Sequence, residues 1–138
     1  CLSVSGGAAP GSDNAYSLGY SNYRWSVVYA ATSAISTSDR REKRDIYYDL
    51  SRYDELFDRL KPASYRLKGG ASGRTHTGLV AQDVEAAMAD CGLTGRDLAA
   101  FVHAEDGSYG LRYEEFIALC IRQIQKLNQR VKRLEEMR

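Results

Sequence analysis

The C-terminal stretch from about Tyr113 to Arg138 constrains the fold more than any other part of the chain, because it contains neither Gly nor Pro. Its apolar residues recur at alternating intervals of three and four, which is the pattern of an α-helix with one apolar seam. In heptad positions, β-branched residues occupy a, and a thiol and two leucines occupy d: Ile117, Ile124 and Val131 at a, and Cys120, Leu127 and Leu134 at d.

This seam predicts association between parallel copies of the helix. Arg130 at a g position can meet Glu135 at the next e position of a neighbouring helix. β-branched residues at a with Leu at d favour dimers, whereas Ile121 at e widens the apolar face and favours more strands. The seam is short, so an ordinary helix packed on its own domain remains the alternative.

Composition argues against several classes of function. The formal net charge is +1, which gives no bulk attraction to nucleic acid. No apolar run approaches the roughly 20 residues that a membrane-spanning helix needs, and the N-terminus carries no export signal. The 138 residues are enough to bury one hydrophobic core. Because the chain begins at Cys1 rather than Met, we expect it to be a fragment of a longer protein.

The cysteines do not indicate a metal site. Cys1, Cys91 and Cys120 are odd in number and lack the spacing of metal ligands, so we expect neither a metal nor another cofactor. Cys120 falls within a helical apolar pattern, where we expect a buried, reduced thiol that packs as a small hydrophobe.

Residues 1–37 differ from the rest of the chain, because Asp13 and Arg24 are their only charged side chains. The segment is rich in Gly, Ser, Asn and Tyr, and residues 23–29 (YRWSVVY) are typical of a β-strand. A segment this apolar is not ordinary disorder. Its strands are too short to bury much surface alone, so we expect pairing with other copies or with a fibrous body upstream.

From residue 38 onward charge is dense and ordinary elements are predicted. Ser51 and Asp54 resemble a capping box that begins a helix, which Pro62 ends. Two strands and a glycine-rich loop follow, then a helix ended by Gly92, then a mixed connector with a brief final strand; the expected strands and helix cover residues 63–67, 75–80, 81–89 and 109–113.

Ser38, Asp39, Lys43 and the pair Asp45-Ile46 stand at a spacing that resembles the signature of the intramolecular chaperone auto-processing domain of bacteriophage tail spikes and tail fibres, endosialidases among them. Further similar segments follow in the family's order: LKPASYRLKGG at 60–70, HTGLVAQDVE at 76–85, YGLRYEEFIAL at 109–119 and the C-terminal helix. Residues 13–30 resemble the β-structured stalk that often precedes such a domain.

The resemblance implies an α+β homotrimer: a β-rich stalk at residues 1–37, and an auto-processing domain at 38–138 whose helix at 113–138 forms a parallel trimeric coiled coil. Such domains drive folding and trimerisation of the fibre ahead of them and then cut themselves off. The cut precedes the Ser of the signature, here between Thr37 and Ser38, and a Ser–Lys dyad, matched by Ser38 and Lys43, performs it. The protein would be an autocatalytic serine endopeptidase without an external substrate. Its partners would be copies of itself and the upstream fibre.

The dyad has physical requirements. An offset of five residues turns side chains about 140° apart on a helix and places them on opposite faces of a strand, so Ser38 and Lys43 meet only if the backbone turns between them. Ser38 Oγ would add to the carbonyl of Thr37, giving an ester that water hydrolyses. Lys43 must accept the hydroxyl proton, so its pKa would have to fall from about 10.4 towards neutrality through burial in the assembled trimer.

Three further residues are candidates for supporting the cleavage. Asp39 could orient the turn at Ser38 or pair with an arginine. His76 opens the HTGLVAQ segment, with a structural histidine on a strand as the alternative. Gln82 could contact the catalytic groups, or form a hydrogen bond at a helix start or an interface.

Two other functions stay open: a trimerisation tip that remains attached to its fibre, and a self-cleaving release domain of a membrane-tethered factor. For a fibre chaperone we expect assembly in the host cytoplasm and a mature fibre or spike in the virion tail that lacks the released domain. We expect neither nucleic acid nor membrane as a partner.

Overall fold

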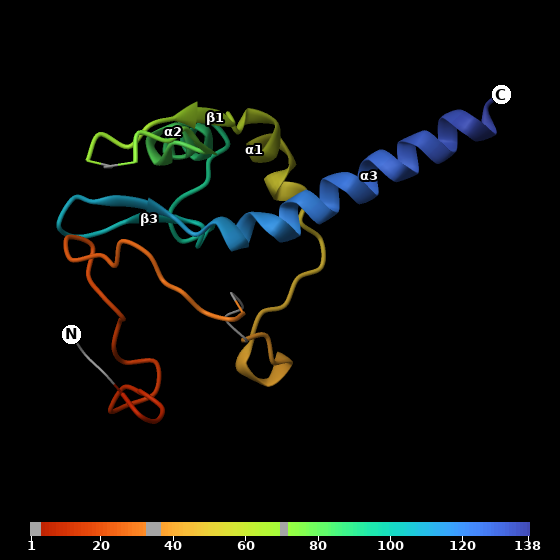
Figure 1. The fold of residues 1–138 in the computed structure, drawn as a ribbon. Coiled ribbons are helices and arrows are strands. Elements are labelled where there is room, and N and C mark those ends of the chain that lie inside the picture. Colours follow the sequence, from red (N-terminus) through yellow and green to blue (C-terminus); the bar gives the residue numbers. More distant parts are fainter. Residues whose placement is uncertain (1–3, 33–36, 70–71) are drawn as a thin grey trace. The chain divides into compact units, whose positions relative to one another are not determined.

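The computed structural model describes residues 4–32, 37–69 and 72–138, and the chain divides into two compact units, Cys1–Asp39 and Arg40–Arg138 (Figure 1). The units do not by themselves test the functional boundary that we predict between residues 37 and 38.

The first unit contains little regular structure in its described residues. Tyr20 and Tyr23 form an isolated antiparallel bridge, in which each backbone N–H donates to the other carbonyl at 3.2 and 3.1 Å. The expected strand over 23–29 does not form in the single chain, where Trp25 and Tyr29 are exposed. A strand pairs its backbone polar groups only with a neighbouring strand, and none is present beside this segment within the described part of the unit.

The second unit is a small mixed α/β domain with short antiparallel strands and a long C-terminal helix. Its strands pair as two separate hairpins, β1 with β2 and β3 with β4. The labels η, α and β denote 3-10 helices, α-helices and strands. In chain order the elements are η1 (Arg40–Glu42), η2 (Ser51–Tyr53), α1 (Asp54–Arg59), β1 (Ala63–Tyr65), β2 (His76–Gly78), α2 (Ala81–Asp90), β3 (Phe101–His103), β4 (Tyr109–Leu111), η3 (Tyr113–Glu115) and α3 (Phe116–Glu136).

The core of the second unit lies where α1, α2 and the start of α3 meet. The inner side of α2 is formed by Val84, Ala87 and Met88, which are buried. They pack with Leu56 of α1 and with further buried apolar side chains, namely Leu93, Leu98, Ala100, Phe116 and Leu119. Because the core includes residues from both ends of the unit, packing of α3 requires α1 and α2 to be in place.

The end of α2 follows the prediction closely. Gly92 has φ +69°, a left-handed conformation that favours glycine. The N–H of Gly92 donates to Ala89 O at 3.1 Å, and the N–H of Leu93 donates to Met88 O at 2.8 Å. These two bonds are the Schellman arrangement, which satisfies the last carbonyls of the helix.

Both hairpins are antiparallel, and only one was expected. Strands β1 and β2 pair Ser64 with Thr77, as the two predicted strands on either side of the glycine-rich loop require. Strand β3 is a correction, because we expected residues 101–103 to lie in the mixed connector. It pairs with β4 through Val102 and Gly110. Three residues are too short a run for a period of two to be recognised.

The predicted capping box at the start of the first helix is wrong. Neither η2 nor α1 has a side-chain cap. Instead the carboxylate of Asp49 accepts the N–H of Ser51 at 2.9 Å. The side chain of Asp54 is directed to α3, as described below.

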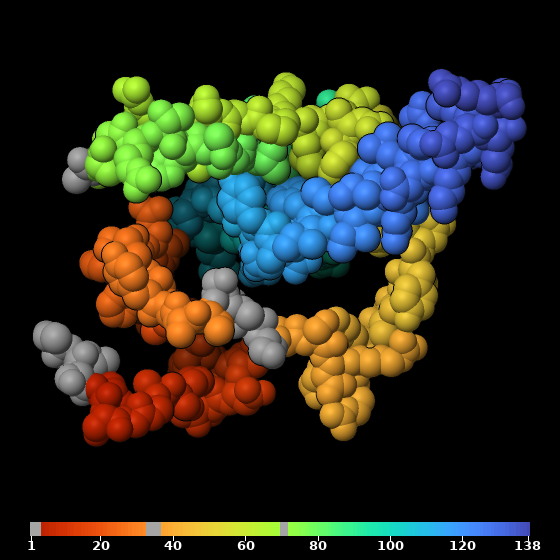
Figure 2. All heavy atoms as spheres, turned by 45° about the vertical axis from the view of Figure 1, so that its right-hand side comes forward, coloured from red at the N-terminus to blue at the C-terminus, as the bar shows by residue number. Residues whose placement is uncertain are grey.

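Helix α3 is confirmed, with no break from Phe116 to Glu136. Its first turns pack on the domain through Phe116 and Leu119, and its later turns extend beyond the other elements of the second unit (Figures 1 and 2). From residue 127 onward every residue of the chain is exposed.

Candidate functional site

The residues of the predicted cut are exposed. Thr37 and Ser38 precede Asp39, the last residue of the first unit, and Lys43 directly follows η1 in the second unit. All four side chains are exposed in the single chain. Because Ser38 and Lys43 belong to different units, their pairing stays a prediction that rests on the resemblance.

The segment that contains Lys43 changes direction. One turn of 3-10 helix ends there, with the N–H of Lys43 donating to Arg40 O at 3.1 Å. Asp45 follows at φ +53°, a left-handed conformation that is uncommon outside glycine. Arg40 Nη1 then donates to Tyr48 Oη at 3.0 Å, which closes the segment into a loop. The backbone therefore turns within residues 40–48, and the meeting of Ser38 with Lys43 stays a prediction.

His76 and Gln82 lie on neighbouring elements. His76 is on β2, half-buried, and its ring stacks on Tyr65 of β1 with 5.7 Å between ring centroids. That contact is what a structural histidine on a strand would make. Gln82 is exposed as the second residue of α2. A part of Asp39, His76 or Gln82 in cleavage stays a prediction.

The predicted seam forms an exposed apolar stripe along α3 in the single chain. Cys120, which we expected to be buried, is exposed as well. Each of the other seam side chains retains more than half of its accessible surface: Ile117, Ile124, Leu127, Val131 and Leu134. Packing of this helix on its own domain was the alternative to association. Such packing buries only the opposite side of α3, and only at its first turns.

The opposite side of α3 is held to α1 by one carboxylate. Asp54 accepts two hydrogen bonds from Arg122, each 2.8 Å long, and one from Gln123 at 2.7 Å. It also forms an ion pair with Lys126 at 3.0 Å. The hydrogen bonds from Arg122 hold the pKa of Asp54 far below its usual range; Lys126 and Gln123 act in the same direction and partial burial opposes them. This contact directs the polar side of α3 inward and leaves the seam facing outward.

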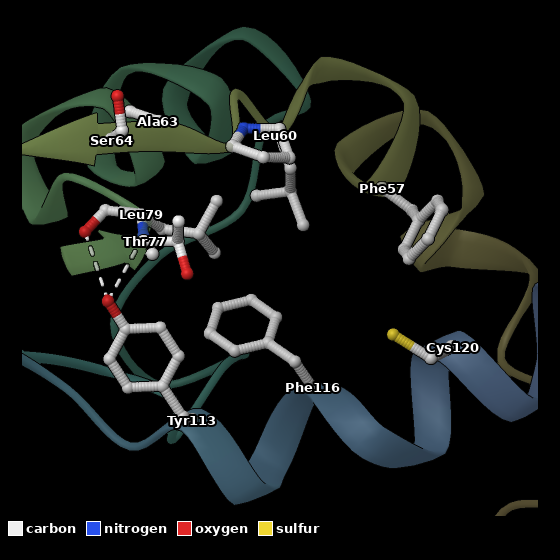
Figure 3. Close-up of a pocket in the computed structure, with 11 residues that line it drawn as sticks. Phe57, Leu60, Ala63, Ser64, Thr77, Leu79, Tyr113, Phe116 and Cys120 are labelled. Atoms are coloured by element: carbon white, nitrogen blue, oxygen red, sulfur yellow. Dashed lines mark hydrogen bonds between the residues drawn. The ribbon is translucent and has the colours of Figure 1, made fainter. Parts of the chain in front are cut away.

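An apolar groove of about 700 Å³ lies beside the first turns of α3. Figure 3 shows Phe116 and Cys120 on the helix side of this groove, with Leu60 and Phe57 across from them. None of the lining residues is charged: Phe57, Leu60, Pro62, Ala63, Ser64, Thr77, Gly78, Leu79, Tyr113, Phe116 and Cys120.

Tyr113 closes one end of this groove against β2. Its hydroxyl accepts the N–H of Leu79 at 3.0 Å and donates to the carbonyl of Leu79 at 3.2 Å (Figure 3). Gly78 makes this approach possible, since a Cβ there would lie 2.6 Å from the Tyr113 oxygen. The two family-like segments that contain Gly78 and Tyr113 are thus in direct contact.

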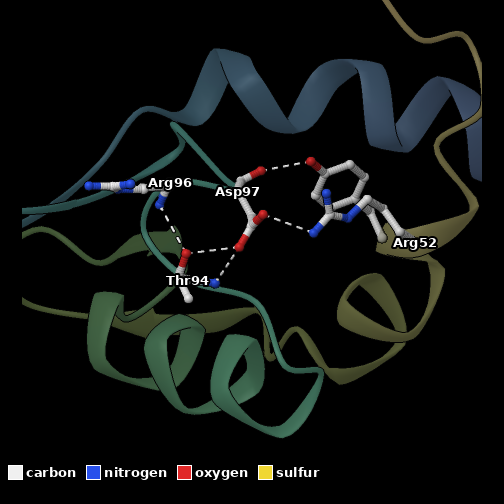
Figure 4. Close-up of polar contacts among 5 residues, drawn as sticks. Arg52, Thr94, Arg96 and Asp97 are labelled. Carbon is white, nitrogen blue, oxygen red and sulfur yellow. Dashed lines mark hydrogen bonds and ion pairs between the residues drawn. The ribbon is translucent and has the colours of Figure 1, made fainter.

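A second polar cluster fixes the connector after α2 (Figure 4). Asp97 accepts the N–H and the hydroxyl of Thr94, both at 2.8 Å, and pairs with Arg52 at 2.8 Å. The hydroxyl of Tyr53 donates to the Asp97 carbonyl at 2.7 Å. The backbone N–H of Thr94 is the main reason that the pKa of Asp97 is lowered. These contacts tie the connector to η2.

Two classes of site are absent from the described ranges 4–32, 37–69 and 72–138. No group of three or more His, Cys, Asp or Glu side chains is placed to hold a metal ion. No helix there has the length and apolar character needed to cross a membrane.

Residues 38–93 match the sequence model of the family described as chaperone of endosialidase. The match begins at Ser38 and includes η1, the β1–β2 hairpin and α2. This segment is therefore similar to the chaperone-of-endosialidase family.

Proteins similar to this chain occur in phage tails. The chain is 29% identical over 131 residues to the tail spike protein of an Escherichia phage, an alignment that covers 93% of this chain and 16% of the tail spike. Its fold matches a structure of the carboxy-terminal domain of the bacteriophage T5 L-shaped tail fibre with its intra-molecular chaperone domain. The TM-score is 0.64 at 22% identity, covering 94% of this chain and 38% of that one.

Three structural residues of the second unit were missed by sequence reasoning: Asp54, Asp97 and Tyr113. Each acts through a partner at least 34 residues away in the sequence, such as Arg122, which is 68 residues from Asp54. No local pattern carries such a pairing. The segment that contains Gly78 and the segment that contains Tyr113 both resemble the family. This shared resemblance is the signal that could have suggested the contact between them.

Proposed function

We propose that the chain is part of a phage tail fibre or spike, and that residues 38–138 are a chaperone for their own fibre. In this proposal they drive folding and homotrimerisation of the upstream chain and are then released by one autoproteolytic cut. The released domain is absent from the mature virion tail, after assembly in the host cytoplasm. The main support is the exposed apolar stripe on α3, because the rest of the domain packs only on the other side of the first turns of that helix.

Burial of the stripe drives the association. Its side chains alternate with the a and d spacing of a parallel coiled coil, in which each inserts between residues of a neighbouring helix. Apolar surface removed from water contributes about 25 cal/mol per Å², so several half-exposed Ile, Leu and Val side chains in three helices give a substantial driving force. Ile121 at e favours three strands over two.

The cut follows from the dyad. Ser38 Oγ adds to the carbonyl carbon of Thr37 while Lys43 takes the hydroxyl proton. The peptide C–N bond then breaks, Lys43 returns the proton to the nitrogen of Ser38, and an ester joins Thr37 to the Ser38 oxygen. Water hydrolyses this ester, which leaves a carboxylate at Thr37 and a free amine at Ser38.

Assembly would control the timing of the cut. Lys43 is exposed in the single chain. Beside it, Ile46, Tyr47 and Tyr48 are also exposed, and Tyr47 and Tyr48 each keep more than three quarters of their surface. Such aromatic surface is expected to acquire a partner in the trimer. Burial of this segment would dehydrate Lys43 and favour its neutral form.

The intact mass of the purified protein under denaturing conditions tests the cut. We expect fragments of residues 1–37 and 38–138 in the parent and one full-length species in Ser38→Ala. Ser51→Ala, which changes a serine outside the signature, is the matched control and should cleave normally. A full-length parent would instead favour a trimerisation tip that stays attached.

The base is tested by Lys43→Arg, with Lys61→Arg as its control. An arginine does not lose its proton near neutral pH, so Lys43→Arg should remain uncut while Lys61→Arg is cut as the parent is. Cleavage of Lys43→Arg at the parent's rate would exclude Lys43 as the base.

A further inference from the structure

We infer that the apolar groove beside α3 is the receptor for Ile121 of a second copy of this chain. The inference rests on the proposed assembly through α3, and it names a contact outside the a and d positions of the seam. It assigns an occupant to a groove that the single chain leaves open to solvent.

The groove lies on the side of the seam that a neighbouring helix must approach. Phe116 directly precedes Ile117, an a position, and therefore occupies a g position. Together with Cys120 at d, Phe116 forms the helix side of the groove (Figure 3). In a parallel coiled coil, residues at g face the e residues that flank the seam of the neighbouring helix.

The e residue that faces Phe116 is Ile121. The offset from g to the next e position is five residues, which is also the offset from Arg130 to Glu135. One parallel register therefore pairs opposite charges at the distal turns of α3, and at the proximal turns it places Ile121 opposite Phe116, which is 7% exposed and forms part of the groove wall. Charge complementarity selects the register, and the register brings Ile121 to the mouth of the groove.

The chemistry of the groove fits this occupant. Its lining contains aliphatic and aromatic side chains, a thiol and hydroxyl groups, and no charge. Ile121 keeps 51% of its surface in the single chain although it lies on the first half of α3. A β-branched apolar side chain against such a lining removes water from both surfaces. A charged peptide or a nucleic acid would leave its charges without partners there.

The energetic test uses Ile121→Glu, with Gln125→Glu as the charge-matched control one turn further along α3. We expect the midpoint concentration of assembly, measured by native mass or sedimentation, to rise at least about ten-fold for Ile121→Glu, since a buried carboxylate would lack a partner. Gln125→Glu should change it less than about two-fold. Circular dichroism of each variant checks that α3 remains folded. Equal assembly of both variants and the parent would overturn the inference.

The contact itself is tested by disulfide formation between different chains. Chains with Leu60→Cys, in the groove, are mixed with chains carrying Ile121→Cys, or Gln125→Cys as control. We expect oxidation to join Leu60→Cys chains to Ile121→Cys chains at least about ten-fold more than to the control, because disulfides form only at short Cβ distances. All chains carry the same background substitutions: Ser38→Ala, Cys1→Ser, Cys91→Ala and Cys120→Ala.

The outcomes separate this inference from the proposed function. If the mixed chains assemble and both cysteine pairs cross-link equally or not at all, the groove has another occupant and the assembly through α3 stands. If the parent and every variant are monomeric at all concentrations tested, the proposed assembly fails and the inference fails with it.

Discussion

The two units of this chain differ in how much apolar surface each buries within a single chain. The second unit buries an apolar core drawn from α1, α2, the connector after α2 and the start of α3. In the first unit, none of the described residues is buried, and the apolar side chains of Tyr16, Leu18, Trp25 and Val28 remain largely exposed. The first unit therefore contains apolar side chains that could pack, but the described ones are not buried within that unit.

This difference explains why the association seam lies where it does. A segment that needs neighbouring copies to bury its surface cannot fold before those copies are brought together. The second unit can fold within a single chain and presents its apolar stripe on α3, so it can gather the copies first. That order of events is the one that the proposed chaperone role of residues 38–138 requires.

The largest expected difference between the two units is in cooperative thermal unfolding when each unit is prepared alone. A polypeptide of residues 40–138 should show a cooperative thermal transition by circular dichroism, because it contains the whole buried core. A polypeptide of residues 1–39 should show none at the same concentration. A cooperative transition in residues 1–39 alone would contradict the comparison.

Truncation of one leucine in each unit gives a second test of the difference between the units. Leu56 is 0% exposed in the second unit, so Leu56→Ala should reduce the free energy of unfolding by about 2–5 kcal/mol in urea titrations. Leu18 is 82% exposed in the first unit, so Leu18→Ala should change it by less than about 0.5 kcal/mol. Similar losses for both variants would mean that the first unit packs its leucine in the single chain.

The contact between β2 and η3 gives a smaller effect. Gly78→Ala should destabilise by about 1–3 kcal/mol, because its Cβ would force the Tyr113 hydroxyl away from Leu79. In the Tyr113→Phe background the same change should cost less, since the oxygen that it meets is gone. Gly95→Ala, where a Cβ meets no atom within 4 Å, is the control. Additive losses in the double variant would argue against this contact.

The anchor of α3 should depend on pH. The pKa of Asp54 is lowered in the folded state, mainly by Arg122, so its contribution is complete above the unfolded pKa of about 3.9. That contribution is lost as pH falls through the folded pKa. Asp54→Asn should therefore destabilise by about 1–2 kcal/mol at pH 7, with a smaller difference from the parent in strong acid. Asp58→Asn, on the same helix, is the control in urea titrations at both pH values.

Much of the fold could be predicted because its signals are local. The buried side of α2, its end at Gly92, the β1–β2 hairpin and the length of α3 all follow from spacing and turn residues within each segment. Asp54 could not be assigned in this way, because α3 lies far along the chain and its basic side offers a stronger partner than a helix cap. Strand β3 was missed for its shortness.

The candidate site also combines features that the sequence predicts with features that it does not. The a and d spacing predicted a seam, and the structure adds that these side chains are exposed in the single chain. Spacing offered no reason to pair Ser38 with Lys43, so this dyad comes from the resemblance alone. The groove was unforeseen, because its lining combines residues of α1, both strands of a hairpin and α3.

The native mass of the full chain with Ser38→Ala tests the central claim most directly, because this variant keeps both units joined. The account predicts a species of three chains, formed as the stripe on α3 is buried. A single chain at every concentration up to the limit of solubility would contradict it.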